Sequence, residues 1–591
     1  MHHGGHVPAD EVDTRQVTGD QGVAALDAPP VGTPFGYLFP ELEDKPDSHL
    51  PGDPATVVAN LNALGAAMVP DPTADPPPDT GNSTIPPIYT YWGQFVDHDL
   101  TANTDRDSTT SDITRPDLAP LAPENVVQNL RNLRRPNLDL DSVYGGGPSF
   151  CDDRSPDAAL YDGPRMRLGH NHEAGIVGEK IPPVDDLERD LPRIGPLLDD
   201  GVITMDVLPE SLQADPNVRT RPLIGDLRND ENLLVSQIHT AVLRFHNAVL
   251  KRIDTDPVAL GLQPGSHEAV RFERARQLTR WHYQWLVVHD YLRTVTTSGV
   301  VDKVLLGGAK HYRPGPGQPL FMPLEHSVAA FRFGHSMVRG SYDHNRNFGE
   351  RHPGQGVGPP LIPSAPFGLL FEFTGNGFSL DPSDPTKSVR NPFRGAPTLP
   401  FNWIIEFDRF TNKGDADPTH FARRIDTQLS PPLGGLVNEG TSADVQDAGH
   451  AAIRGLLRHL ARRNLLRGYL LSIPTGQAVA ALLGVPALTD DELRAGNPPA
   501  VNSALDDGGF LLNTPLWYYV LKEAEVRANG NSLGEVGSRI VCETIIGLLR
   551  NDPDSYLSRN GGWDPSQGVA LPNGDPIVTI RDFLSFTGVP V

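Results

Sequence analysis

The chain of 591 residues has only two cysteines, Cys151 and Cys542, so no disulfide framework can hold it together. Its longest apolar runs, such as residues 479–485, stop at glycine or proline, far short of the roughly 20 residues that a membrane helix needs. Basic residues are outnumbered, 50 against 74 acidic ones. The resulting net charge of −24 argues against nucleic acid or an anionic membrane as the partner.

The N-terminus has neither a basic segment nor an apolar core, so the sequence predicts no secretory signal peptide. The compartment stays open, either cytoplasmic or reached by a non-classical export route. Residues 1–85 are rich in proline, aspartate and glycine, which predicts an extended arm with one short helix near residues 57–68. No repeat and no later linker is visible, which favours a single domain over residues 86–591.

Apolar residues recur three and four positions apart along much of the chain, which predicts a mainly α protein with long Pro/Gly-rich loops. A long helix is expected from about Asp226, and a second over residues 268–295. Further helices are expected near residues 324–338, 442–467, 475–483, 516–527 and 534–550. Short β-like runs such as residues 369–373 are few, so little β-structure is expected.

Polar residues spaced one helical turn apart recur on four segments, and each set would share one helix face. Taken alone, each set has an ordinary explanation, such as a hydrogen-bonded core histidine or a surface ion pair. Together they would direct several charges into an apolar interior, which is costly unless a bound group compensates them. The four sets are Gln94 and His98 with Asp97, Arg228 and Glu231, Arg332 and His335, and Asn464 and Arg467.

Five segments occur in one order: WGQFVDHDLT, LDLDSVYG, GDLRNDENLLVSQIHTAVLRFHN, FRFGHS and RRNLLRG. With them the sequence resembles the animal-type haem peroxidase family of the peroxidase–cyclooxygenase superfamily, from about Ile88 to about Leu549. The resemblance implies a single large helical domain around a buried haem b. The shortage of cysteine and the absence of a signal peptide favour a bacterial member of this family.

The resemblance implies roles for both faces of the haem. His98 matches the distal histidine, which takes a proton from hydrogen peroxide and returns it to the leaving oxygen. Arg228 matches the distal arginine, and Gln94 lines the position of a small anion above the iron. His335 matches the proximal iron ligand, and Asn464 the asparagine that accepts its Nδ1–H.

Further positions match residues at the edge of the haem. Arg332 and Arg467 match the arginines that neutralise haem propionates. Asp97 and Glu231 match the carboxylates that form ester links to haem methyl groups. Asn232 stands where a methionine makes a third link, so that link is absent. His239 and His246, seven residues apart, are interpreted as packing residues rather than metal ligands.

A calcium site beside His98 is also implied by the resemblance. Asp99 and Asp139 match family ligands, Asp141 replaces a common serine, and Asn137 would offer its backbone carbonyl. Oxygen ligands of this kind suit calcium. Arg135 stands where the family usually has threonine, so it removes a hydroxyl ligand, offers only a backbone carbonyl and adds a positive charge.

The implied function is a peroxidase that uses hydrogen peroxide to form a ferryl intermediate and then oxidises halide, pseudohalide or small phenolic donors. A fatty-acid dioxygenase of the same superfamily is the first alternative. It is disfavoured because Arg332 stands where such enzymes carry a radical-forming tyrosine, although the more distant Tyr342 could substitute. The second alternative, a calcium-stabilised adhesion protein, has no use for the pair His98 and Arg228. The natural reductant and the oligomeric state stay open.

Overall fold

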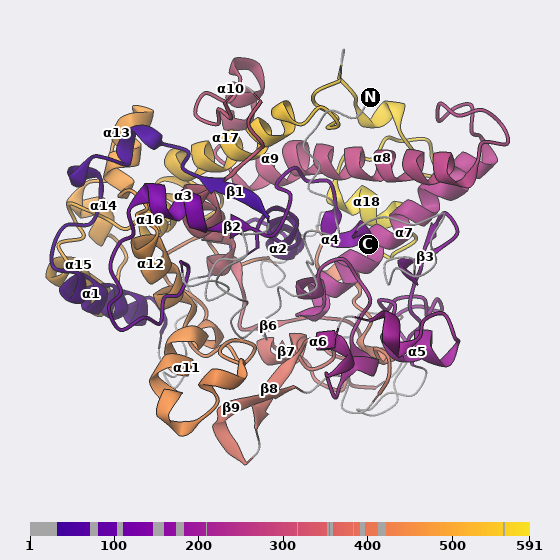
Figure 1. Ribbon diagram of the computed structural model, residues 1–591, viewed down its shortest axis with the longest axis horizontal. Helices are drawn as coiled ribbons and strands as arrows, with labels where there is room; N and C mark the ends of the chain where they lie inside the picture. The colour runs from indigo at the N-terminus through magenta and orange to yellow at the C-terminus, as the bar shows by residue number, and fades with distance from the viewer. Residues whose placement is uncertain are drawn as a thin grey trace.

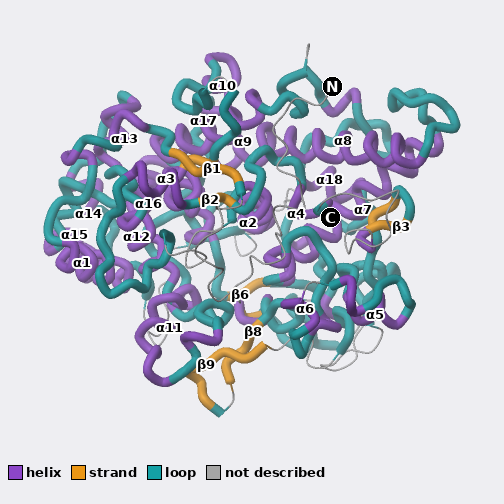
Figure 2. The backbone as a smooth tube through the Cα atoms, viewed as in Figure 1, coloured by secondary structure: helices purple, strands orange, loops and turns teal. Residues whose placement is uncertain are grey.

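The computed structural model describes residues 32–70, 81–102, 110–145, 159–172, 182–208, 210–315, 317–350, 354, 358–381, 383–390, 396–411, 421–559 and 562–591. Helices dominate this part of the chain and surround α2, which lies near the centre of Figure 1. The strands are short and scattered, with loops between most elements (Figure 2). The expected mainly α fold with little β-structure is confirmed.

Helices of eight residues or more form the frame of the molecule. They are α1 (Pro54–Ala67), α2 (Ile88–Leu100), α7 (Leu233–Thr255), α8 (Glu268–Leu286), α10 (Val300–Gly307), α11 (Ala451–Arg458), α12 (Leu460–Leu470), α13 (Gly476–Leu483), α15 (Pro499–Asp507), α16 (Leu516–Ala528) and α17 (Glu535–Asn551). Shorter ones are α3 (Pro123–Asn129), α4 (Asp141–Tyr144), α5 (Ile194–Asp199), α6 (Glu210–Gln213), α9 (Leu292–Val295), α14 (Asp490–Arg494) and α18 (Ile580–Phe586).

The described strands form four small sheets rather than one large one. β1 (Thr33–Gly36) pairs antiparallel with β2 (Arg131–Asn132) and parallel with β5 (Met322–Pro323). The other pairs are antiparallel: β3 (Tyr161–Asp162) with β4 (Arg165–Met166), β6 (Ser341–Tyr342) with β7 (Ala365–Pro366), and β8 (Phe378–Asp381) with β9 (Asp384–Arg390). The β8–β9 hairpin extends from the bottom of the view in Figure 1.

The two long helices expected near the middle of the sequence are present, with later starts or local distortions. Asn232 caps α7 by accepting a hydrogen bond from Val235 N at 3.1 Å, so the helix begins at Leu233 rather than near Asp226. The preceding residues Leu227–Asp230 form a tight 3-10 turn, η8. α8 continues through the π-helical turn η9 (Val287–Tyr291) into α9, as expected for residues 268–295.

Three sequence expectations differ from the structure. Residues 324–338 form a π-helical turn, η10 (Glu325–Ala329), followed by the 3-10 helix η11 (Ala330–Met337), because the backbone breaks from helical geometry at Ala329. The helix expected over residues 442–467 is divided by His459, whose extended backbone separates α11 from α12. Residues 369–373 are not a strand but lie in a 3-10 helix, η12 (Phe367–Leu370), and the turn after it.

The described part of the N-terminal arm packs into the core. Phe35, Leu38 and Phe39 are each 1% exposed, and the carboxylate of Glu325 accepts hydrogen bonds from the backbone nitrogens of Leu38 and Phe39 at 2.8 and 3.1 Å. α1, the helix expected near residues 57–68, lies against α12 and α15 at the left of Figure 1. Residues 1–31 and 71–80 of this arm lie outside the described residues.

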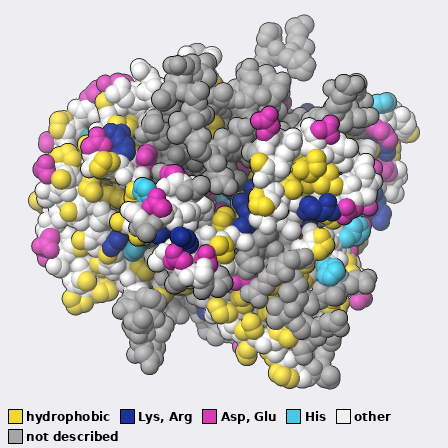
Figure 3. Space-filling view, turned by 60° about the horizontal axis from the view of Figure 1, so that its bottom comes forward, with side chains coloured by type: hydrophobic (Ala, Val, Ile, Leu, Met, Phe, Trp, Pro, Cys, Tyr) yellow, Lys and Arg dark blue, Asp and Glu magenta, His cyan; other side chains and the backbone are white. Residues whose placement is uncertain are grey.

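No helix in the described ranges is long and apolar enough to span a membrane. On the face shown in Figure 3, the described Lys and Arg side chains lie in small separate groups among acidic ones.

Candidate active site

His98 is held inside the protein by α2, a helix that is buried along most of its length and packs against α7 and η11. Its side chain is almost fully buried, and its Nδ1 lies 3.0 Å from the amide oxygen Oδ1 of Asn229. Burial lowers the pKa of His98 to about 3, and the nearby Arg228 lowers it further. The imidazole is therefore neutral near pH 7 and able to accept a proton.

Arg228 is fixed by the acidic residue two positions before it. Asp226 accepts from Arg228 Nε at 3.2 and 3.1 Å and from Nη2 at 2.7 Å, while the backbone oxygens of Thr101 and His98 accept from Nη1 and Nη2 at 2.9 and 3.0 Å. Burial opposes the charge, but Asp226 raises the pKa of Arg228 above its ordinary value. The result is a permanently charged guanidinium beside His98.

Gln94 lies one turn before His98 and is held from two sides. Its Nε2 donates to Glu231 Oε1 at 3.2 Å, and its Oε1 accepts from Asn232 Nδ2 at 3.1 Å. Burial raises the pKa of Glu231 to about 7, and the charge of Glu439 adds to the shift. Gln94 thus has a fixed orientation. Glu231 is partly protonated at neutral pH.

His335 belongs to η11, and its Nδ1 lies 2.9 Å from the side-chain amide of Asn464 on α12. The Nδ2 atom faces His335 in this arrangement, and the buried Oδ1 of Asn464 has no hydrogen-bond partner among the described residues. Turning the amide by 180° places Oδ1 against an Nδ1–H donor, which frees the Nε2 lone pair of His335 to bind a metal. Asn464 is therefore well placed to select the ligating tautomer.

Basic residues converge between the segment of His98 and that of His335. Arg332 donates from Nε to Ser327 O at 2.8 Å, and the fully buried Arg467 has a pKa lowered to about 9 by burial. Arg463, almost fully buried, pairs with Glu439 at 2.5 Å. Burial lowers the pKa of His335, and the charges of Arg332 and then Arg463 lower it further. The carboxylate of Asp97 acts electrostatically on Arg332 and Arg467, which brings residues of α2, η11 and α12 into one site.

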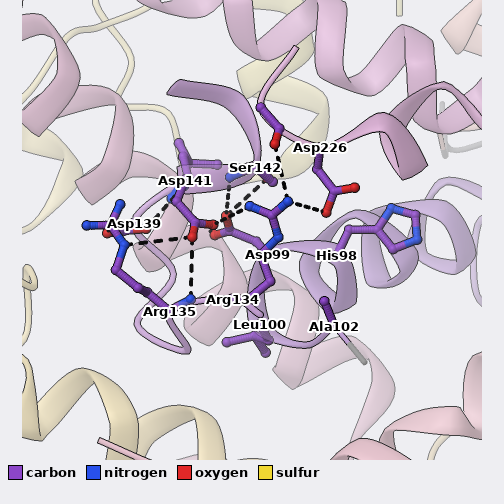
Figure 4. A network of polar contacts seen from close by, with 12 residues as sticks. His98, Asp99, Leu100, Ala102, Arg134, Arg135, Asp139, Asp141, Ser142 and Asp226 are labelled. Carbon is purple, nitrogen blue, oxygen red and sulfur yellow. Dashed lines mark hydrogen bonds and ion pairs between the residues drawn. The ribbon is translucent and has the colours of Figure 1, made fainter. Parts of the chain in front are cut away.

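Three carboxylates meet directly beside this site. One oxygen from each of Asp99, Asp139 and Asp141 lies within 4.8 Å of the others. Asp99 is fully buried and accepts from Leu140 N at 3.1 Å and from Ser142 Oγ at 3.1 Å. Burial raises its pKa well above the ordinary value, and so do the other two carboxylates. Figure 4 shows the His98 ring pointing away from this acidic triad, as neighbouring residues of a helix do.

Two arginines contact the triad (Figure 4). Arg135 Nη2 lies 3.3 Å from Asp139, and its Nε lies 3.7 Å from Asp141. Arg134, fully buried, bridges Asp141 at 3.3 Å and Asp226 at 2.7 Å. The backbone oxygen of Asn137 accepts from Gln284 Nε2 at 3.2 Å, so the carbonyl expected to bind calcium already has a donor. The triad thus offers oxygen ligands, but a guanidinium competes for two of the three carboxylates.

Sequence reasoning missed several residues of the site. Asp226, Asn229 and Arg134 orient the predicted residues, and Arg463 adds a cation. Their signals were available in part, since Asp226 and Asn229 belong to the same GDLRNDE segment as Arg228, and Arg463 adjoins Asn464. Contacts over long sequence separations, such as Arg134 with Asp226, leave no periodic pattern in the sequence.

Comparison with known proteins finds a family match for part of the chain. Residues 199–359, which include Arg228 and His335, match the family model described as animal haem peroxidase. This match identifies an animal haem peroxidase domain over 161 of the 591 residues. A peroxidase-like protein of Margaritifera margaritifera is 25% identical over 272 residues, which cover 44% of this chain and about a third (32%) of the relative.

Solved structures of the superfamily are similar over most of the chain. The fatty acid alpha-dioxygenase of Oryza sativa has a TM-score of 0.50 at 13% identity, covering 94% of this chain and 78% of that one. Peroxidase A of Dictyostelium discoideum has a TM-score of 0.48 at 16% identity, covering 89% of this chain and 88% of that one. At such low identity the dioxygenase likeness shows the shared fold alone.

The residues present fit the haem of the animal haem peroxidase family. Asp97 Oδ1 and Asn464 Oδ1 are buried oxygens without a hydrogen-bond partner in the part of the chain that the structure describes. The guanidinium groups of Arg332 and Arg467, whose pKa values burial lowers, match the two carboxylates that a haem carries. A dianionic group bound here would compensate charges that burial otherwise disfavours.

Proposed function

We propose that the protein is a haem peroxidase that uses hydrogen peroxide to oxidise small donors. The supporting observation is the arrangement on both sides of one buried site: His98 with Arg228, each fixed by a hydrogen-bond partner, and His335 with Asn464. His335 would ligate the iron, and Arg332 and Arg467 would pair with the propionates. When bound, haem b would supply the two electrons that reduce hydrogen peroxide, and the donor would later replace them.

The chain's own residues move the proton. Neutral His98 would accept it from one peroxide oxygen and return it to the other oxygen, which would then leave as water. Arg228 stabilises the negative charge that develops while the O–O bond lengthens, because Asp226 keeps the guanidinium charged and fixed in place. Gln94, held by Glu231 and Asn232, lines the space where peroxide or a small anion would lie.

The donors that we propose are halides, pseudohalides and small phenols. The fatty-acid dioxygenase alternative lacks a tyrosine three residues before His335, since Arg332 stands there. Tyr342, the more distant candidate, is buried with its ring 5.7 Å from that of Tyr91, and its hydroxyl accepts from Arg339 N at 2.9 Å. A non-catalytic adhesion role would leave the pair of His98 and Arg228 without a purpose.

One experiment separates these functions. The purified protein is examined by absorption spectroscopy before and after one equivalent of peroxide, and its turnover of a phenol and of bromide is compared with oxygen uptake on linoleic or oleic acid. A haem spectrum that responds to peroxide, with donor turnover, supports the peroxidase. Rapid oxygen uptake yielding one stereodefined hydroperoxide, with weak phenol and bromide turnover, would identify a dioxygenase. A protein without haem would favour the adhesion role.

Ester links between the haem and the protein are a further part of the proposal. Asp97 and Glu231 are the two carboxylates available, and Glu231 has a raised pKa of about 7. Acid–butanone extraction before and after peroxide treatment tests the links, because only free haem is extracted. Complete extraction after treatment, with no haem-modified peptide in mass spectrometry, would contradict them.

Calcium is the second cofactor that we propose, bound by Asp99, Asp139 and Asp141. Their oxygens converge as calcium ligands do, and the raised pKa values of Asp99 and Asp141 reflect burial among like charges that a divalent cation would relieve. Binding requires Arg135 to give up at least one of the two carboxylates that it contacts. The role of Arg135 in this site is therefore competition with the ion rather than ligation.

A further inference from the structure

A chain of buried hydrogen bonds runs from His98 to a second histidine. His98 Nδ1 lies 3.0 Å from Asn229 Oδ1, and Asn229 Nδ2 lies 3.0 Å from His239 Nδ1 on α7. Asn229 and His239 are fully buried, and His98 is almost so. The single amide of Asn229 thus joins two imidazoles that are 141 residues apart in the sequence (239 − 98).

In the orientation that the Asn229 amide has here, its donor and acceptor atoms define where the protons lie along this chain. Asn229 Nδ2 can only donate, so His239 Nδ1 must be the acceptor and its proton must sit on Nε2. Asn229 Oδ1 can only accept, so His98 Nδ1 must carry the proton. His98 Nε2 is then a lone pair, which is the form that can take a proton from a peroxide.

We propose that His239 is a positioning residue that sets the tautomer of His98 through the amide of Asn229. Without an acceptor at His239 Nδ1, the Asn229 amide can turn over and present its NH₂ group to His98. That orientation makes His98 Nδ1 an acceptor and moves the proton to Nε2, where it blocks the base. The inference rests on the proposed function for its catalytic consequence, but the tautomer itself is a property of this chain.

The burial of the three side chains explains why this coupling would persist. Water is not available to satisfy an amide or imidazole in the protein interior, so each polar atom depends on the partner beside it. Burial also lowers the pKa of His239 to about 3, so its ring is neutral and carries one proton on one of its two nitrogens. A neutral ring is required for either tautomer to exist.

The test compares two substitutions at one position. His239→Asn places an amide oxygen near the present Nδ1 and keeps the acceptor, whereas His239→Leu has a similar branched shape and no acceptor. The full-length protein is labelled with nitrogen-15 histidine, and two-bond proton–nitrogen correlations report which nitrogen of His98 carries the proton. Spectra are taken of the haem-free protein and of its diamagnetic ferrous carbon monoxide complex, with His98→Gln used to assign the signals.

The expected result is Nδ1 protonation of His98 in the wild type and in His239→Asn, and partial or complete transfer to Nε2 in His239→Leu. The reaction with peroxide should slow roughly tenfold or more in His239→Leu and stay near the wild-type rate in His239→Asn. Adding Asn229→Asp to His239→Leu should restore Nδ1 protonation, because a carboxylate can only accept. A merely structural role for His239 would not produce this rescue.

An unchanged His98 tautomer in His239→Leu, or the same change in His239→Asn, would overturn the inference. If His239→Leu does not fold, Asn229→Leu tests the same coupling, because it removes the acceptor beside His98 Nδ1. Full Nδ1 protonation of His98 in Asn229→Leu would equally overturn the inference. Haem content is measured on the same samples. A wild-type protein that binds no haem would contradict the proposed function. The tautomer of His98 is tested separately, because it is measured in the haem-free protein.

Discussion

Both carboxylate oxygens of Asp226 accept hydrogen bonds from the guanidinium of Arg228, two residues later in the chain, at 2.7 to 3.2 Å. Burial alone would keep this carboxyl protonated, but Arg134 and Arg228 together hold its pKa below the ordinary value. Asp226 therefore connects the acidic triad, through Arg134, with the guanidinium beside His98. The position of Arg228 depends on a charge that the motif alone does not reveal.

Replacing Asp226 by asparagine should loosen Arg228 without emptying the site. The amide can accept only through its oxygen, so the hydrogen bonds to the second carboxylate oxygen are lost. The negative charge that pairs with Arg134 and Arg228 is lost as well. We expect the peroxide reaction to slow by about 10- to 100-fold and stability to fall by about 1.5–3 kcal/mol. Stopped-flow spectroscopy and thermal unfolding measure the two effects.

Asp199→Asn is the matched control for this change. Asp199 pairs with Arg219 at 2.6 Å, but the two side chains are 67% and 53% exposed, so removing the charge should alter neither rate nor stability measurably. Equal behaviour of the two variants would show that Asp226 does not position Arg228.

Loss of either distal side chain should separate haem binding from catalysis. His98→Ala removes the base and Arg228→Ala the fixed charge, while His335 and Asn464 are untouched. Each variant should retain haem but react with peroxide about 10²- to 10⁴-fold more slowly. His170→Ala, at an exposed histidine, serves as the control. Wild-type rates in both distal variants would show that the distal side is misassigned.

His335→Ala should lose most of its haem and all activity, since His335 is the ligand that we assign to the iron. Asn464→Leu should be milder: the imidazole stays, but the acceptor that orients it is gone, which typically costs about 10- to 100-fold in affinity or activity. Haem content by absorption and the position of the ferric bands distinguish the two outcomes. A normal five-coordinate histidine spectrum in His335→Ala would exclude His335 as the ligand.

The sequence predicted the long, strongly periodic helices best, because buried apolar residues recur three and four positions apart along α7 and α8. It failed where backbone geometry departs from the α-helix around the site. Arg228 lies in the 3-10 turn η8, and His335 lies in the 3-10 helix η11, which follows a π-helical turn. Helical spacing grouped these residues correctly, but the local backbone is set by tertiary contacts that periodicity does not encode.

The sequence also does not predict which side chains contact one another across long sequence separations. The motif supplied His98, but His239 was interpreted as packing, because nothing in a single sequence indicates that Asn229 joins the two. Likewise the sequence indicates that Arg135 weakens a calcium site, but it does not reveal the ion pairs that Arg135 makes with Asp139 and Asp141. Hydrogen bonds depend on rotamers and burial, and neither follows from residue order.

Arg135→Thr should strengthen calcium binding. The substitution removes a cation that contacts two of the three carboxylates and supplies a hydroxyl oxygen in its place. Calcium at the same free concentration should then stabilise the variant more than the wild type. The difference in unfolding free energy depends on the ratio of their calcium affinities. Thermal unfolding against calcium, with magnesium as control, measures this. An equal or smaller calcium response in Arg135→Thr would contradict competition at this site.

Glu325 should make stability depend on pH through its contact with the N-terminal arm. Burial raises the pKa of Glu325 from 4.5 to about 7, although the backbone nitrogens of Leu38 and Phe39 donate to it and oppose the shift. The folded protein therefore binds a proton more tightly than the unfolded chain does. This contribution is fully present below about pH 4.5 and is lost as pH rises through about 7, a total of roughly 3 kcal/mol.

Glu325→Gln removes the titrating group while keeping one oxygen for the arm. Its unfolding free energy should lack this decline, so the difference between wild type and variant should shift in favour of the variant as pH rises from 5 to 8. Urea unfolding at several pH values measures the difference. Glu535→Gln, at a partly exposed carboxylate, should follow the wild-type profile. Parallel profiles for wild type and Glu325→Gln would mean that Glu325 is already ionised in the folded protein at pH 5, and that its two hydrogen bonds from the arm outweigh burial.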